Sequence, residues 1–181
     1  MTTFVALLRG DNVSGRKPIR MAELLKRCEK LGLKHVRTYL QSGNVVFSAG
    51  QTDPRKLAAA LKARIAEDFK HDVEVLVLSA KELNRVADSN PLRRRLNGED
   101  NLFHATFLFQ PVSEERFRKL KLPAQPGEEA VWAGQAVFLY CPHGYGRTKL
   151  NNTFFEKAFS VSATTRNWRT VLALQERCAE P

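Results

Sequence analysis

Short apolar runs and amphipathic stretches alternate along the chain, in an order that restricts the possible folds. Four segments have the apolar or alternating character of strands, at residues 3–9, 35–40, 44–48 and 73–78. Two segments between them carry apolar side chains at helical spacing, at residues 21–31 and 54–69. The order over residues 1–79 is therefore β-α-β-β-α-β, the split pattern of a ferredoxin-like domain.

The second half of the chain begins with the same order. A strand is predicted at residues 102–109, a short helix at 113–120, and a hairpin of two strands at 130–133 and 136–141 around Gly134 and Gln135. The predicted fold is α+β, with two ferredoxin-like (split β-α-β) lobes and additional C-terminal helices. The predicted lobes are residues 1–79 and 101–181, joined by a helix and linker at residues 80–100.

Local signals mark the predicted helix starts. Asp53 followed by Pro54 is typical of an N-cap and the first helical residue. Thr153 and Glu156 have the spacing of a capping box, which predicts a helix start there. The last helix, at about residues 167–177, is predicted to be capped by Thr165 or a neighbour. Its core face is predicted to contain Trp168, Val171 and Leu172.

The positive charge is concentrated in two blocks of the sequence. The chain has a formal net charge of +10. Residues 1–40 hold nine bases and three acids, and residues 143–170 hold five bases and one acid. If the two blocks adjoin in space, they form a surface that attracts phosphate or nucleic acid. A solubilising surface is the alternative interpretation.

Cysteine and histidine patterns indicate neither a disulfide framework nor a metal site. The three cysteines and four histidines are scattered, without C-x-x-C or H-E-x-x-H spacing. No apolar run approaches the roughly 20 residues that cross a bilayer, and the N-terminus lacks the features of a signal peptide. We therefore expect a cytoplasmic protein without metal or cofactor and without a membrane partner.

Three motifs spread along the chain carry a family resemblance. Residues 7–15 read LLRGDNVSG, residues 38–47 read TYLQSGNVVF, and the third motif combines GRTKL at 146–150 with ATTRNWRTV at 163–171. With these motifs the chain resembles the bacterial domain-of-unknown-function family 1697. Asp11 and Ser14 depart from the family pattern, which has an apolar residue and a glycine there. The resemblance implies two ferredoxin-like α+β lobes and carries no established activity.

The loop after the first strand has the composition of an anion site. It leads from a strand into a helix, where backbone amides and basic side chains favour an oxyanion. A nucleotide-hydrolysing P-loop is disfavoured because Gly15 is followed by Arg-Lys-Pro instead of Lys-Ser or Lys-Thr. A solvated connecting loop is the alternative. The candidate anion-binding residues here are Arg9, Asn12, Arg16, Lys17 and Arg20.

The segment Gln41–Asn44 is first of all a hairpin turn around Gly43. Its functional interpretation uses the amides of Gln41 and Asn44, with Ser42, to hold a base edge or a sugar hydroxyl. An RNA-recognition module is disfavoured, because the predicted central strands carry only Phe4 and Phe47 as stacking aromatics.

The second basic block is also rich in glycine. Arg147 and Lys149 follow two glycines, and Arg166 and Asn167 precede the last helix, so all four are candidate anion-binding residues. His143 is the one candidate for general acid-base catalysis, because it is the histidine within this block.

The sequence predicts a protein that binds a phosphate-bearing ligand, a nucleic acid or nucleotide, in a basic cleft between the lobes. Two alternatives stay open. The protein could be an enzyme acting on a small anionic substrate in the same cleft, or a module whose basic face binds an acidic protein.

Overall fold

A computed structural model describes residues 1–9, 18–40, 42–51 and 53–181. Its contacts divide the chain into two compact units. The first unit comprises residues 1–84 and 174–181, and the second comprises residues 85–173. The sequence placed the boundaries at residues 79 and 101, and assigned the last residues to the second lobe. In the structure residues 174–181 group with the first unit, where Arg37 pairs with Glu180 and donates to the Arg177 carbonyl at 2.7 Å.

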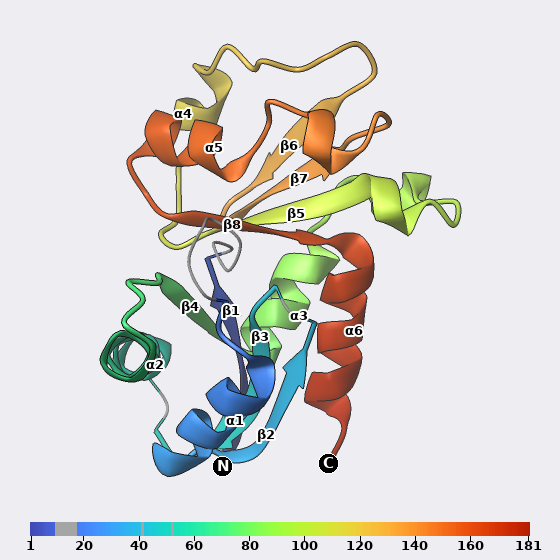
Figure 1. Cartoon of the computed structure of the whole chain (residues 1–181). Coiled ribbons are helices and arrows are strands. Elements are labelled where there is room, and N and C mark those ends of the chain that lie inside the picture. Colours follow the sequence, from blue (N-terminus) through green and yellow to red (C-terminus); the bar gives the residue numbers. More distant parts are fainter. Residues whose placement is uncertain (10–17, 41, 52) are drawn as a thin grey trace. The chain divides into compact units, whose positions relative to one another are not determined.

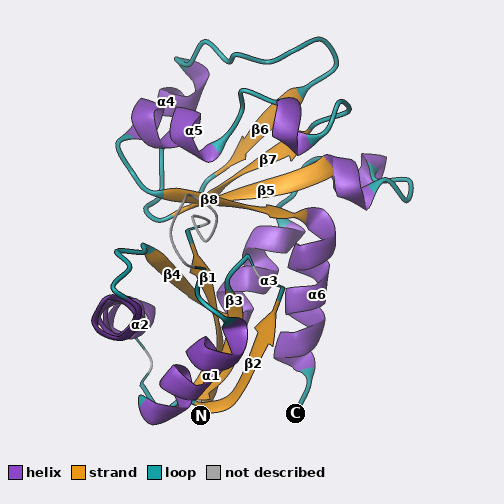
Figure 2. Ribbon diagram, viewed as in Figure 1, coloured by secondary structure: helices purple, strands orange, loops and turns teal. Residues whose placement is uncertain are grey.

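The first unit is built on a four-stranded antiparallel sheet (Figures 1 and 2). Its strand order is β2-β3-β1-β4. The strands are β1 (Thr2–Leu8), β2 (Lys34–Tyr39), β3 (Asn44–Ala49) and β4 (Val75–Ser79). The helices α1 (Met21–Lys30) and α2 (Pro54–Phe69) cover one face. The core between them includes Phe4, Phe47, Leu61 and Ile65, each at most 3% exposed.

Local chemistry explains the boundaries of these elements. Asp53 caps α2, since its Oδ1 accepts the Arg55 N–H at 2.9 Å, and Pro54 is the first helical residue, as predicted. Gly43 turns the β2–β3 hairpin with a φ of +83°, and a Cβ there would lie 2.8 Å from the Leu8 Cβ. Glycine is therefore required both by the backbone conformation and by the close approach of β1.

Helix α3 (Ala80–Asp88) follows β4 without a loop. Ser79 and Glu82 form a capping box at this junction: the Glu82 carboxylate accepts the Ser79 N–H at 2.7 Å, and the Ser79 hydroxyl accepts the Glu82 N–H at 3.1 Å. The chain then passes through 3-10 turns at Arg93–Arg95 and Asp100–Leu102.

The second unit repeats the topology. Its sheet has the order β6-β7-β5-β8. The strands are β5 (Phe103–Leu108), β6 (Glu129–Ala133), β7 (Ala136–Tyr140) and β8 (Ala163–Asn167). The helices α4 (Glu114–Arg118) and α5 (Asn152–Phe159) cover one face (Figure 1). The predicted α+β fold of two ferredoxin-like lobes with additional C-terminal helices is thereby confirmed.

Two predicted capping interactions in the second unit are wrong, although both helices begin close to the predicted positions. Asn151, and not Thr153, caps α5 by accepting the Phe154 N–H at 3.0 Å, and the Glu156 carboxylate accepts the Ala163 N–H instead of closing a capping box. Thr165 lies within β8. Helix α6 (Trp168–Ala179) follows it directly, and the side-chain Oδ1 of Asn167 accepts the Arg169 N–H at 2.8 Å.

The core face of α6 differs from the prediction at one residue. Trp168 and Val171 are buried, whereas Leu172 is 37% exposed. The Trp168 ring packs edge-on against Phe138, with ring centroids 6.1 Å apart. No helix within the described ranges is long and apolar enough to cross a membrane.

Candidate functional site

The described site residues predicted in the first unit lie at one end of its sheet, where β1 ends. The Leu8 N–H donates to the Gly43 carbonyl at 2.9 Å, and the Arg9 N–H donates to the Glu74 carbonyl at 2.8 Å. These two bonds bring the end of β1 beside the β2–β3 turn and the residues before β4. Arg20 directly precedes α1 and is exposed. Asn12, Arg16, Lys17 and Gln41 lie outside the described residues.

The side chain of Asn44 has a structural task in the hairpin turn. Asn44 is fully buried, and its Nδ2 donates to the Tyr39 carbonyl at 2.8 Å and to the Ser42 hydroxyl at 3.0 Å. Ser42 itself is exposed. The Asn44 amide nitrogen, which was predicted to contact a ligand, therefore forms hydrogen bonds within the turn.

A cavity of about 340 Å³ opens beside the start of α1. Helix α1 connects the parallel strands β1 and β2, and α2 connects the parallel strands β3 and β4, which run the other way. The two helices are therefore antiparallel to one another. The N-terminal end of α1 therefore lies beside the C-terminal end of α2. The cavity is lined by Pro18, Ile19, Arg20, Glu23, Arg27, Asp68, Phe69 and His71. Arg20 was predicted as a site residue, and the others were not.

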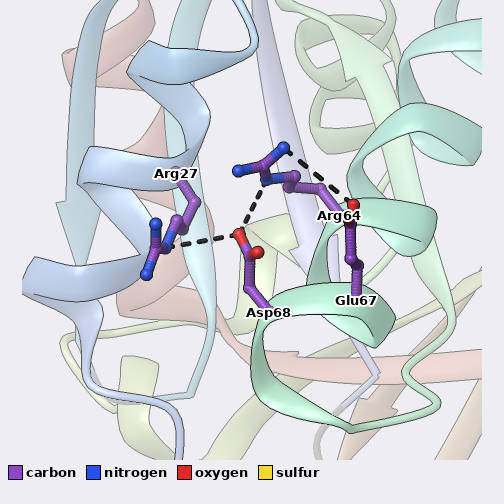
Figure 3. A network of polar contacts seen from close by, with 4 residues as sticks. All are labelled: Arg27, Arg64, Glu67 and Asp68. Carbon is purple, nitrogen blue, oxygen red and sulfur yellow. Dashed lines mark hydrogen bonds and ion pairs between the residues drawn. The ribbon is translucent and has the colours of Figure 1, made fainter.

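A charged network spans the two helices at this cavity (Figure 3). Asp68 Oδ2 lies 2.7 Å from Nε of Arg64 and 3.3 Å from Nε of Arg27. The Asp68 side chain is only 14% exposed. Glu67 is a more distant partner of Arg64, at 4.0 Å. Arg27 binds Asp68 through Nε and also lines the cavity.

Arg20 differs from four other arginines of the first unit. Arg27, Arg37, Arg55 and Arg64 each have a carboxylate partner. Arg20 has no ion pair with a residue in the described ranges, and its side chain does not cap α1. A second hollow of about 270 Å³ continues along α1 and is lined by Glu23, Lys26, Arg27 and Lys30. The outward side of α1 thus carries more cations than anions.

The predicted residues of the second unit lie at the end of its sheet where β5 begins, whereas those of the first unit lie where the equivalent strand β1 ends. The residues of the second unit follow the end of β7 or lie at the end of β8. Arg147 and Lys149 are exposed, and neither pairs with a carboxylate of the described chain. His143 is also exposed, and its Nε2 lies 2.9 Å from the Pro126 carbonyl. Its position gives no carboxylate or nucleophile partner for acid-base chemistry among the described residues.

Arg166 and Asn167 point to opposite faces of the second sheet. In the strand register Arg166 lies opposite Ala105, and Asn167 lies opposite His104. Arg166 is only 4% exposed, and its Nη1 donates to the Thr164 hydroxyl at 2.7 Å and to the Thr165 carbonyl at 3.0 Å. Burial lowers the pKa of Arg166 to about 10. Arg166 is thus a buried group, unlike the exposed Arg147.

A row of polar side chains lies on the helix-covered face of this sheet, and sequence reasoning singled out only Asn167 of them as a site residue. The Thr106 and Thr165 hydroxyls are 2.8 Å apart, and the Thr165 hydroxyl donates to Asn152 Oδ1 at 2.6 Å. His104 is two residues before Thr106 and therefore on the same face. Polar residues at alternate positions of β5 were the available signal. We call His104, Thr106, Asn152, Thr165 and Asn167 the polar row.

His104 is the buried titratable group of the polar row. It is 7% exposed, and its ring stacks on Tyr145 with centroids 4.8 Å apart. Its Nδ1 is buried and has no hydrogen-bond partner among the described atoms. Burial lowers the pKa of His104 to about 4, so the ring is neutral at pH 7.

The comparisons with known proteins agree with this architecture. A conserved bacterial protein from Streptococcus pneumoniae has a similar solved structure, with a TM-score of 0.76 and 21% sequence identity. The similarity covers 98% of each chain, and at this identity it establishes the fold alone. No curated protein matches the sequence. A family model described as a protein of unknown function (DUF1697) matches residues 1–138. The chain therefore belongs to the DUF1697 family.

Proposed function

We propose that this protein binds a phosphate-bearing ligand of nucleotide size in the cavity at the start of α1. The ligand would be a free nucleotide or the terminal nucleotide of a nucleic-acid strand. The observation that carries the proposal is the pair of guanidinium groups at this cavity: Arg20 has no described ion pair, and Arg27 is held by Asp68. Guanidinium forks match the geometry of phosphate oxygens.

The start of α1 supports the same conclusion. The first amides of a helix have no intrahelical partner, and the helix dipole favours an anion there. Arg20, at the N-cap position, makes no side-chain capping bond to these amides. An oxyanion at this point would accept amide hydrogen bonds and also contact the guanidinium groups.

The size of the cavity favours a small ligand. Small-molecule sites measure about 300–1,000 Å³, and this cavity of about 340 Å³ lies at the lower end of that range. Phe69 and His71 add ring surfaces to its lining, which suit a nucleobase or a sugar face. A flat basic surface for an acidic protein would need no such hollow.

The test is a binding titration at low ionic strength with a fluorescently labelled mononucleotide and a short single-stranded oligonucleotide. We expect Arg20→Ala to weaken binding of both probes by roughly tenfold, the effect of losing a charge-assisted phosphate contact. Lys56→Ala is the matched control, because Lys56 is exposed at the start of α2, at the other end of that helix.

Three results would decide the proposal. Tighter binding of the oligonucleotide, with a steeper salt dependence, would identify a nucleic-acid strand as the ligand. Equal binding of both probes would identify a nucleotide. Binding that responds equally to Arg20→Ala and Lys56→Ala would place the phosphate elsewhere and overturn the proposal.

A further inference from the structure

The cavity at the start of α1 contains carboxylates as well as guanidinium groups. Glu23 and Asp68 line it together with Arg20 and Arg27. A site for a purely anionic ligand has no use for carboxylates, because each one repels a phosphate. The two carboxylates therefore need separate explanations.

Asp68 is explained by the protein itself. It is largely buried, and its Oδ2 is bound by Arg64 at 2.7 Å and by Arg27 at 3.3 Å (Figure 3). Two guanidinium groups more than neutralise its charge. Asp68 thus positions Arg27 and presents little negative charge to a ligand.

Among the described residues, Glu23 has no corresponding cationic partner. It lies four residues before Arg27 on α1, the spacing at which a glutamate and an arginine usually pair on a helix surface. In this structure Arg27 directs its Nε to Asp68 of the other helix. Glu23 is exposed and forms no ion pair within the described part of the chain. Its carboxylate lines the cavity and also the hollow that continues along α1.

We infer that the ligand of this cavity carries a cationic amino group in addition to its phosphate, and that Glu23 binds this amino group. The inference rests on the proposed function. Arg20 and Arg27 bind the phosphate end, and Glu23 binds the ammonium end. A zwitterionic ligand of this kind matches both signs of charge in the lining, whereas a simple phosphomonoester leaves Glu23 facing a negative group.

The test compares phosphoethanolamine with ethyl phosphate, which has a hydrogen in place of the amino group. Binding of each compound to the full chain is measured by NMR chemical-shift titration at low salt. We expect phosphoethanolamine to bind about three- to fivefold more tightly, as an exposed ion pair provides. Glu23→Gln should remove this preference, leaving the affinity for ethyl phosphate unchanged or slightly higher.

The matched control is Glu29→Gln. Glu29 is an exposed glutamate of the same helix and is outside the cavity lining. This variant should keep the preference for phosphoethanolamine. Thermal unfolding of both variants by circular dichroism checks that the helix is intact, and a preference lost in Glu29→Gln as well would overturn the assignment to Glu23.

The remaining outcomes separate this inference from the proposed function. If both compounds bind equally and Arg20→Ala weakens both, the phosphate site stands and the role of Glu23 is refuted. If neither compound binds, while a mononucleotide does, Glu23 does not recognise an amino group at this distance from phosphate, and the inference fails. If no phosphate compound binds, both proposals fail together.

Discussion

The two units share one topology and differ in what they place on it. Both have the order β-α-β-β-α-β followed directly by a helix, and the strand orders β2-β3-β1-β4 and β6-β7-β5-β8 are equivalent. The helices differ in length: α2 has 16 residues and its counterpart α5 has 8, while α1 has 10 and its counterpart α4 has 5. One strand arrangement therefore tolerates helical layers of very different size.

The candidate sites occupy opposite ends of the two sheets. In the first unit the cavity and Arg20 lie at the end where β1 finishes. In the second unit Arg147 and Lys149 follow β7, at the end where β5 begins. A shared fold thus does not imply equivalent sites, because the loops at either end of a sheet vary independently.

The polar row makes the contrast sharper. In the first unit two partner pairs of the β1–β4 pairing on the helix-covered face are Phe4–Ser79 and Ala6–Val77. The equivalent positions of the second unit are His104, Thr106, Thr165 and Asn167. The same sheet face can hold polar side chains because they form hydrogen bonds with one another: the Thr106 hydroxyl with that of Thr165, and the Thr165 hydroxyl with Asn152.

The largest expected effect concerns the short helix α5. Phe155 is fully buried and packs against Phe159, with centroids 6.1 Å apart. Because α5 has only two buried side chains, we expect Phe155→Ala to lower the free energy of unfolding by about 3–5 kcal/mol. Both tryptophans, Trp132 and Trp168, lie in the second unit, so denaturant unfolding followed by tryptophan fluorescence measures this loss there. A loss below about 1 kcal/mol would show that the site collapses around the cavity.

The next effect is the pH dependence of His104. Its pKa is about 4 in the folded protein, against about 6.5 when unfolded, so the unfolded chain binds more protons between these values. Stability should therefore fall by about 3 kcal/mol as pH drops from 6.5 to 4. His104→Phe, which introduces the residue of the first unit, should remove this part of the slope. Urea unfolding at several pH values tests this, and an unchanged slope would contradict it.

A smaller effect is expected at the threonine pair of the polar row. Thr165→Val should cost about 1–3 kcal/mol, because the buried Thr106 hydroxyl and Asn152 Oδ1 lose their hydrogen-bond partner. Thr106→Ala combined with Thr165→Val introduces the residues that the first unit has at the equivalent positions, Ala6 and Val77. The double variant should lose less stability than the sum of the single variants. A double-mutant cycle by urea unfolding measures this coupling, and strict additivity would argue against a connected network.

The smallest effect compares helix surfaces. Arg118 and Glu114 pair on α4 at 2.8 Å, with side chains 74% and 51% exposed. Arg64 and Asp68 pair on α2 with side chains only 29% and 14% exposed. We expect a coupling of about 0.3–0.5 kcal/mol for the α4 pair and a larger one for the α2 pair. Double-mutant cycles at low and high salt check the order, and the reverse order would contradict the role of burial.

Much of the fold was predictable because its signals are local. Asp53 with Pro54 marked the start of α2, and glycine with a strand on either side marked the β2–β3 hairpin. The capping of α5 shows the limit of such signals. Thr153 and Glu156 have the right spacing, yet Asn151 makes the capping bond, because β8 offers Glu156 the Ala163 N–H.

The candidate site was predictable only in part. Arg20 was identified from the basic composition after the first strand, and the structure places it at the cavity. Arg27, Asp68 and His71 gave no signal, because their meeting depends on how α1 and α2 pack. Arg166 shows another limit of the sequence, because its motif did not indicate that it is buried and bonded to its own strand.

The sequence by itself determined the order of the strands and helices, the hairpin turns and the two blocks of positive charge. These features depend on residues that are close together in the chain. The tertiary structure alone decided which charges are already paired and which face a cavity. The pairing of Arg27 with Asp68 joins residues of different helices. The polar row likewise joins residues of β5, β8 and α5. Such contacts depend on strand order and helix packing, which bring together residues that no short-range spacing connects.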